Sequence, residues 1–211
     1  MTMAQLYIPD PIERSDLGLF VARAVRLDNG ALVRFRAVGS RLHAWVATPF
    51  DALVTRSVSG WVRPADLTIK GSDLLIAMAV VDNTVIDPGQ AQDALWCCTL
   101  PPERGWRAVD QVPAEVLADL AGQGAAVARA SAGRHGGPPA QLLDQKVITV
   151  SGAGLHVGVP LRCLFALSGM GFLRKTAAET VRVRATDSWL RLDARSGAVL
   201  RRRNALLPLL V

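Results

Sequence analysis

Arginine and tryptophan alternate with apolar residues in two short segments of the chain, residues 33–45 and 181–195. Arginine neutralises phosphate or carboxylate groups, and a tryptophan ring can stack on an unpaired base or anchor a protein interface. This pattern indicates a face that binds either another protein or a nucleic acid. The candidate binding residues are Arg34, Arg36, Arg41 and Trp45 in the first segment, with Arg182, Arg184, Trp189, Arg191 and Arg195 in the second.

The net charge of the chain is distributed unevenly. The formal net charge is +6, and residues 172–203 hold nine basic residues against three acidic ones, so the rest of the chain is balanced. Such a local surplus attracts polyanions or an acidic partner. Two alternatives stay open: a solvated arginine-rich face without a partner, or a sheet face covered by the chain's own helices, with guanidinium groups reaching solvent past buried stems.

The remaining residues that could do chemistry are scattered. Gly152 and Gly154 could belong to a nucleotide-binding loop only if a helix began there, and the alternation that follows predicts a hairpin instead. No signature of a serine hydrolase, a phosphate-binding loop or a zinc protease occurs. No metal and no cofactor are therefore expected. The histidines have no second ligand type at metal spacing; they are His43, His135 and His156.

The three cysteines do not form a recognisable redox or metal motif. Cys97 and Cys98 are adjacent, and Cys163 lies among apolar residues. We expect all three to be reduced and mostly buried, and a buried thiol is usually inert. A cysteine–histidine nucleophile pair stays open because such pairs form in space rather than in sequence.

The two arginine-containing segments resemble each other in sequence. When residue 33 is aligned with residue 181, six of eleven positions are identical. In both copies apolar residues occupy every second position, as in a strand with one buried face, and turn-forming residues interrupt the run. Each copy predicts two antiparallel strands, followed by a third near residues 52–58 and 198–203.

A helix is predicted before each group of three strands. Residues 15–27 suit a helix with Ser15 as its N-cap and Asn29-Gly30 at its C-terminus, and Pro160 suits the first turn of the later helix. A hairpin around Asn29-Gly30 is the alternative. The apolar residues at helical spacing in the first helix are Leu17, Phe20, Val21 and Ala24.

These elements predict an α+β fold of two pseudo-repeated α-β-β-β lobes with antiparallel sheets. The stacking of such units resembles, at the level of fold alone, that of the sliding DNA clamps, whose sheets present a basic surface. We expect an N-terminal α/β lobe with a helical extension over residues 1–131, a Gly/Pro linker at 132–141, and a C-terminal lobe over 142–211, packed together as one compact unit.

The segment between the two copies predicts further elements. A strand and a short helix are expected over residues 66–81, a strand over 93–101, a helix from near Pro113, and two strands joined by a glycine turn over 142–160.

Composition narrows the class of function. Half of the residues are hydrophobic, no stretch is long enough to span a membrane, and the N-terminus lacks the pattern of a signal peptide. The sequence therefore predicts a cytoplasmic, non-catalytic binding or assembly module, a homodimer, which binds another protein through its Arg/Trp face. Nucleic-acid binding by the same face is the alternative, and an enzyme of unrecognised type is the third possibility. The apolar end of the chain, residues 206–211, is expected to dock on the protein or across a dimer interface.

Overall fold

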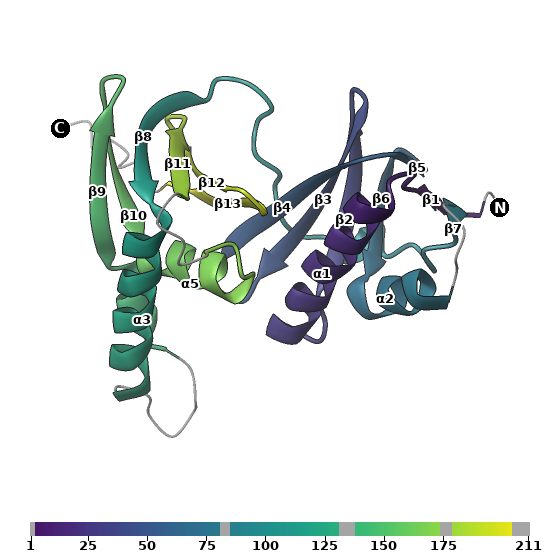
Figure 1. The fold of residues 1–211 in the computed structure, drawn as a ribbon, viewed down its shortest axis with the longest axis horizontal. Coiled ribbons are helices and arrows are strands. Elements are labelled where there is room, and N and C mark those ends of the chain that lie inside the picture. Colours follow the sequence, from purple (N-terminus) through teal and green to yellow (C-terminus); the bar gives the residue numbers. More distant parts are fainter. Residues whose placement is uncertain (1–2, 81–84, 131–137, 174–178, 204–211) are drawn as a thin grey trace. The chain divides into compact units, whose positions relative to one another are not determined.

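The structure is a computed structural model that describes residues 3–80, 85–130, 138–173 and 179–203 (Figure 1). It confirms an α+β fold and divides into two compact units, Met1–Thr99 and Leu100–Val211. The division precedes the predicted linker at 132–141, of which residues 132–137 lie outside the described part of the chain. The predicted docking of residues 206–211 also falls on undescribed residues.

The first unit combines an antiparallel four-stranded sheet, a small three-stranded sheet and two helices. In the larger sheet the strand order is β6-β2-β3-β4, and in the smaller one it is β5-β1-β7. The helices lie side by side, and α1 packs against β3 and β4 (Figure 1). The elements are β1 Gln5–Tyr7, α1 Pro11–Leu27, β2 Leu32–Val38, β3 Arg41–Thr48, β4 Ala52–Ser59, β5 Trp61–Arg63, β6 Asp66–Lys70, α2 Gly71–Val80, β7 Val85–Ile86 and the short 3₁₀ helix η1 Asp93–Leu95.

Helix α1 begins five residues earlier than predicted. Asp10, rather than Ser15, is the N-cap, because its side chain accepts hydrogen bonds from the backbone N–H groups of Ile12 (2.7 Å) and Glu13 (3.3 Å). The buried face consists of the four apolar residues predicted for it. The chain leaves the helix at Asp28, so the alternative hairpin around Asn29-Gly30 is wrong.

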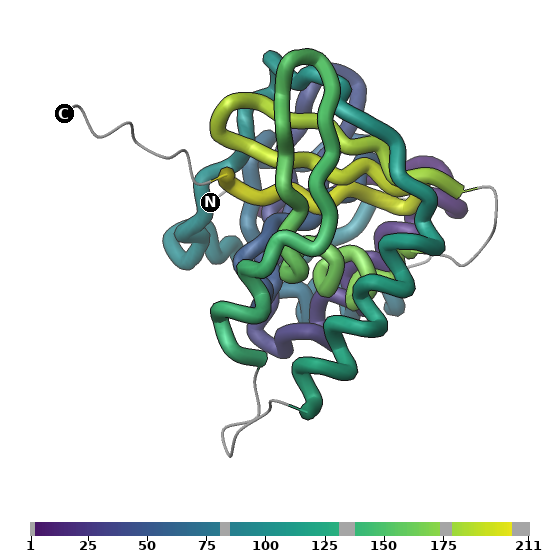
Figure 2. Tube along the Cα trace, turned by 90° about the vertical axis from the view of Figure 1, so that its left-hand side faces the viewer, coloured from purple at the N-terminus to yellow at the C-terminus, as the bar shows by residue number. Residues whose placement is uncertain are grey.

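The second unit has a four-stranded antiparallel sheet in the order β13-β12-β11-β8 and a separate hairpin of β9 and β10. In Figure 2 the strands β11 to β13 appear in yellow-green to yellow as consecutive antiparallel neighbours. The elements are β8 Arg107–Pro113, α3 Ala114–Ala130, α4 Ala140–Asp144, β9 Lys146–Gly152, β10 Leu155–Pro160, α5 Leu161–Gly169, β11 Thr180–Ala185, β12 Trp189–Ala194 and β13 Gly197–Arg202. None of the helices in the described part of the chain is long and apolar enough to cross a membrane.

The two copies of the repeat have the same strand register. Ala37 pairs with Leu42 between β2 and β3, and Ala185 pairs with Leu190 between β11 and β12, which is the same pair shifted by 148 positions. The buried apolar residues on these strands include Val33, Phe35 and Leu42 in one unit, and Val183, Leu190 and Leu192 in the other. The repeated α-β-β-β pattern is therefore confirmed, with α1 and α5 as its helices.

One predicted strand does not form. Residues 93–101 contain η1 and irregular backbone. The Asp93 side chain accepts a hydrogen bond from the Thr68 backbone N–H (2.6 Å), and Gln92 donates to the Thr68 carbonyl (2.7 Å). These bonds occupy backbone groups at the edge of β6, so the segment caps this edge and adds no strand to it.

Candidate binding face

The positive charge of this protein lies on its strands. The described strands carry thirteen basic side chains and three acidic ones, whereas the described α-helices carry five basic and six acidic. This asymmetry holds in both units, although the net surplus along the sequence falls in residues 172–203. The basic strand residues are Arg34, Arg36, Arg41, Arg56, Arg63, Lys70, Arg107, Lys146, Arg182, Arg184, Arg191, Arg201 and Arg202.

Arg34 is held by groups within its own unit. Its Nε and Nη2 atoms donate to the two carboxylate oxygens of Asp66, both at 2.7 Å, and its guanidinium lies 5.8 Å from the centre of the Trp96 ring. The hydrogen bonds from Arg34 hold the pKa of Asp66 below its usual value, although partial burial opposes them. Arg34 therefore joins β2 to β6, and Asp66 neutralises most of its charge.

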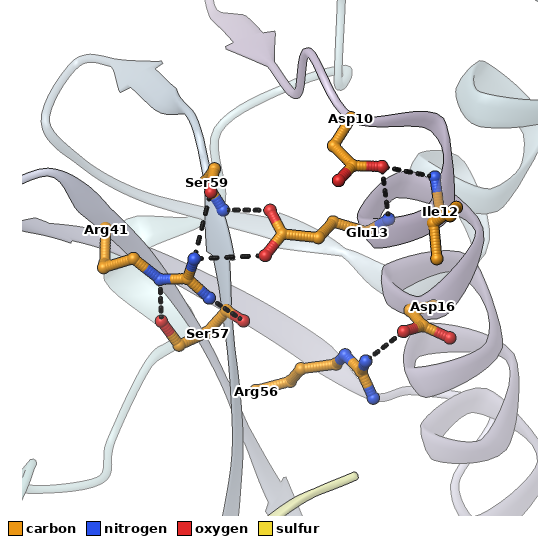
Figure 3. A network of polar contacts seen from close by, with 8 residues as sticks. All are labelled: Asp10, Ile12, Glu13, Asp16, Arg41, Arg56, Ser57 and Ser59. Atoms are coloured by element: carbon orange, nitrogen blue, oxygen red, sulfur yellow. Dashed lines mark hydrogen bonds and ion pairs between the residues drawn. The ribbon is translucent and has the colours of Figure 1, made fainter.

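Arg41 is also held in place, at the junction of β3, β4 and α1 (Figure 3). Its guanidinium donates to the hydroxyls of Ser57 and Ser59, to the Ser57 carbonyl and to Glu13 Oε1 at 3.1 Å. Burial acts to raise the pKa of Glu13, but hydrogen bonds from Ser59 and the charge of Arg41 outweigh it, so the pKa is lowered. A second ion pair, between Arg56 of β4 and Asp16, also joins the sheet to α1.

The two predicted tryptophans are not open to a partner. By strand alternation, Trp45 and Trp189 do lie on the arginine-bearing face, but their residues are only 8% and 6% exposed. Arg202 lies over the Trp189 ring, 5.7 Å from its centre, and Trp45 stacks near His43. Large rings on a sheet face are easily covered by long neighbouring side chains. The expectation that these rings offer stacking surfaces is therefore wrong.

Arg184 and Arg191 share a single carboxylate. Asp193 has a side chain that is only 10% exposed, and it lies 3.3 Å from Arg184 Nε and 2.7 Å from Arg191 Nε. Arg191 also lies 5.8 Å from the centre of the Trp106 ring. These two arginines compensate a nearly buried negative charge, so they contribute to stability and leave one net positive charge at this point.

Several arginines on or beside the strands are exposed, and two of them have a partner within their own unit: Arg63 lies over the Trp61 ring, and Arg107 forms an ion pair with Asp187. We call four others the exposed arginine set: Arg36 in the first unit, and Arg182, Arg195 and Arg202 in the second. Of these, Arg195 is 78% exposed and its guanidinium lies 3.6 Å from Glu179, a distance at which an exposed pair contributes little. Three of the nine candidate residues thus belong to this set, while Arg202 was not among the candidates.

The small sheet carries an aromatic cluster that the sequence pattern does not predict. The rings of Tyr7 and Trp61 stack at 5.4 Å, and the Arg63 guanidinium lies 5.0 Å from the centre of the Trp61 ring. Tyr7 and Trp61 are direct cross-strand neighbours. Strands of two or three residues are too short to show a period of two in their apolar residues. Only the sequence from Gln5 to Ile8 shows a short alternation of this kind.

The described residues contain no group of three histidine, cysteine, aspartate or glutamate side chains that could hold a metal. Ser151 Oγ and His156 Nδ1 lie 2.7 Å apart across the exposed turn of the β9–β10 hairpin. Cys163 is buried as predicted, but Cys97 and Cys98 are exposed, which corrects the prediction for these two. Burial raises the pKa of the Cys98 thiol, and negative charge at Cys97 and Asp51 acts in the same direction. His135 lies outside the described residues.

Two family models match this chain. The family described as domain of unknown function DUF8185 matches residues 101–206, about half of the chain, and domain of unknown function DUF8010 matches residues 1–98. No curated protein matches the sequence.

The solved structures that resemble this chain include bacterial sliding clamps. The DNA polymerase III beta subunit of Thermotoga maritima aligns over 97% of this chain and 66% of its own, with 10% identity and a TM-score of 0.56. A second beta subunit, from Eubacterium rectale, aligns over 95% and 64%, with 10% identity and a TM-score of 0.61. The beta sliding clamp of Caulobacter crescentus aligns over 98% and 67%, with 13% identity and a TM-score of 0.61.

The chain thus spans about two thirds of the length of these clamps. At this identity the likeness establishes a sliding-clamp fold and nothing further.

Proposed function

We propose that this chain, which belongs to the DUF8185 family, is a non-catalytic scaffold with a clamp fold that binds an acidic segment of another protein through its strand arginines. The clamps that it resembles are subunits of a DNA polymerase, so the fold serves assembly in those proteins. Each unit offers its own proposed contacts: Arg36 in the first unit, and Arg182, Arg195 and Arg202 in the second.

One observation carries the proposal. Basic side chains outnumber acidic ones by thirteen to three on the strands, while the helices have no positive surplus. A positive potential at the strands attracts negatively charged partners to them and increases the rate of association. Arginine also pairs with carboxylates through two parallel hydrogen bonds, as Arg34 does with Asp66 within this chain.

The buried tryptophans favour a protein partner over a single-stranded nucleic acid. Non-specific binding of single strands combines a basic groove with aromatic rings on which bases stack. Trp45 and Trp189 are nearly buried, so they do not supply such rings. An acidic peptide needs only the charges and the hydrogen bonds that the exposed arginine set supplies.

Fluorescence anisotropy with three labelled probes tests the proposal: a glutamate-rich peptide, a single-stranded oligothymidylate and a short DNA duplex. We expect the peptide to bind, and the triple variant Arg36→Ser, Arg182→Ser, Arg195→Ser to lose about tenfold in affinity, since each exposed charge contributes roughly 0.5 kcal/mol. The single change Arg129→Ser, at an exposed site on α3, is the control for loss of a positive charge away from the strands and should leave binding unchanged. Peptide binding that is absent, or equal in the triple variant, would contradict the proposal.

Nucleic acid is the second candidate partner. It is favoured by the same strand arginines and by the membership of the related clamps in a DNA polymerase. Duplex binding that is stronger than peptide binding and that weakens steeply between low and moderate salt would favour this candidate, because phosphate contacts release counterions.

A further inference from the structure

Three arginines gather on one face of the strands β11 and β12 in the second unit. In the strand register Arg184 lies directly opposite Arg191, and Arg182 lies directly opposite Asp193. Residues that are opposite each other, or two positions apart on one strand, point to the same face with Cβ atoms about 5 to 7 Å apart. We call Arg182, Arg184 and Arg191 the arginine triad.

The arginine triad carries more positive charge than its surroundings compensate. Asp193 is the acidic residue among them, and its side chain is only 10% exposed. Three positive charges against this one carboxylate leave a surplus of two. Like charges directly opposite each other on neighbouring strands repel, as Arg184 and Arg191 do here. An external anion with two negative charges would compensate the surplus.

Asp193 orients two of the three guanidinium groups. Arg184 and Arg191 both approach the carboxylate most closely through Nε, at 3.3 and 2.7 Å, and the Trp106 ring lies 5.8 Å from the Arg191 guanidinium. In the described part of the chain, the Nη atoms of these two arginines donate no hydrogen bond to another residue. Both side chains are partly exposed, so their Nη donors are left for an external ligand in a geometry that is already fixed.

Arg182 differs from its counterpart in the first unit. Arg34 occupies the equivalent position of the repeat, and both oxygens of Asp66 accept hydrogen bonds from it. Arg182 is exposed and forms no ion pair with any described residue, and the residue opposite it on β8 is the neutral Gln111. The repeat thus has a carboxylate for this arginine in one unit and leaves it without one in the other.

We propose that the arginine triad binds the phosphate group of a phosphorylated side chain within the acidic segment of the partner protein. A phosphate monoester carries a charge of about −1.5 to −2 at pH 7 and three acceptor oxygens, which match the charge surplus and the three guanidinium groups. A carboxylate has one charge and two oxygens. The inference rests on the proposed function, because Arg182 belongs to the exposed arginine set, and it adds Arg184 and Arg191 as contacts.

A phosphorylated peptide fits this site better than a nucleic acid. Each phosphate within a nucleic-acid chain is a diester with a single negative charge, and such phosphates follow each other at regular spacing. The arginine triad is instead a local cluster around one buried carboxylate.

Fluorescence anisotropy with one peptide in two forms tests the proposal: a labelled glutamate-rich peptide with a central serine, phosphorylated or not. We expect phosphorylation to increase the affinity of the wild-type chain at least about tenfold, and Arg182→Ser to reduce this gain to about threefold or less, because one of three charge-assisted contacts is lost. Arg182→Lys keeps the charge without the planar pair of donors, so its gain should be intermediate. Equal affinity of both forms for the wild type, or an undiminished gain in Arg182→Ser, would overturn the proposal.

Arg36→Ser is the matched control, because Arg36 is an exposed strand arginine at the position of the repeat that corresponds to Arg184. It should weaken both forms of the peptide by the same factor and leave the gain from phosphorylation unchanged. Loss of the gain in this variant would contradict the location of the site. If neither form binds, the proposed function fails together with this inference, whereas equal binding of both forms removes this inference alone.

Two further probes separate the sources of phosphate. Inorganic phosphate at millimolar concentration should displace the phosphorylated peptide only in part, because it lacks the neighbouring glutamates. Oligothymidylate with a 5′-phosphate should bind no better than the same oligonucleotide without it. A gain from the 5′-phosphate as large as that of the peptide would assign the site to the end of a nucleic acid and overturn the assignment to a phosphorylated protein.

Discussion

Arg191 Nε lies 2.7 Å from Oδ1 of Asp193, two positions further along the same strand, and Arg184 of the neighbouring strand reaches the other carboxylate oxygen. The carboxylate is nearly buried, so it depends on these two cations. Replacing both arginines by serine should lower the free energy of unfolding by about 2 kcal/mol, because the charge of Asp193 would lose its partners. Urea denaturation measures the loss.

Two further variants complete this experiment. Arg182→Ser, at an exposed position, should change stability by about 0.5 kcal/mol or less. Adding Asp193→Asn to the double variant should restore part of the stability, since it removes the buried carboxylate charge that has lost both arginines. A double variant as stable as the wild type would show that Asp193 does not need its partners. Strand alternation alone predicts that Arg182, Arg184 and Arg191 are equally dispensable for stability, and the contacts of Asp193 change that expectation for two of them.

Trp189→Ala should affect folding more than binding. The residue is 6% exposed and lies beneath Arg202, so its removal leaves a cavity and should lower the free energy of unfolding by about 3 kcal/mol. Chemical denaturation of the variant tests this expectation. A small loss of stability together with a large loss of partner affinity would mean that the ring is exposed to the partner instead.

Stability should fall in acid partly through Glu13. Its folded pKa is lowered, so the carboxylate stabilises the protein above its unfolded pKa, near 4.5, and this contribution disappears as the pH falls through the folded value. The difference in stability between wild type and Glu13→Gln should therefore be greater at pH 7 than at pH 3. Glu115→Gln, at an exposed site on α3, is the control and should differ little from the wild type at either pH. A constant difference for Glu13→Gln across this range would contradict the ion pair with Arg41.

Two glycines of α3 should respond in opposite directions to the same substitution. A Cβ atom at Gly122 meets nothing within 4 Å, so Gly122→Ala should stabilise the helix by up to about 1 kcal/mol. At Gly124 the Cβ would come within 2.8 Å of Leu161 Cδ2, so Gly124→Ala should destabilise the protein. Thermal melts of the two variants provide the comparison. Equal shifts of the two melting temperatures would mean that α3 does not pack against α5 at Gly124 as described.

The three cysteines should fall into two classes of reactivity. A thiol reagent should label Cys97 and Cys98 in the native protein and Cys163 only after unfolding, because Cys163 is fully buried. The raised pKa of Cys98 reduces its thiolate fraction at neutral pH, so labelling there should speed up as the pH rises. Rapid labelling of Cys163 in the native state would instead support the alternative in which this thiol is a catalytic nucleophile.

Several features of the fold follow from the sequence alone. The alternation at Val33, Phe35 and Leu42 sets which side of the strand is apolar, and a shift of one residue would expose all of these side chains, so the register follows from the pattern. The repeat of that pattern predicts the same register in β11 and β12. The apolar spacing in residues 15–27 likewise predicts the buried face of α1, because it depends only on helix geometry.

The accessibility of the candidate site was decided by tertiary structure. Alternation places Arg34 and Trp45 on one face, but Asp66, 32 positions away from Arg34, neutralises the guanidinium, and neighbouring side chains cover the ring. Local pattern specifies the direction of a side chain, whereas exposure and ion pairing depend on residues brought near it by the fold. For the same physical reason Asp93 caps β6 in place of a predicted strand, since the backbone groups of Thr68 reach it only in the folded chain.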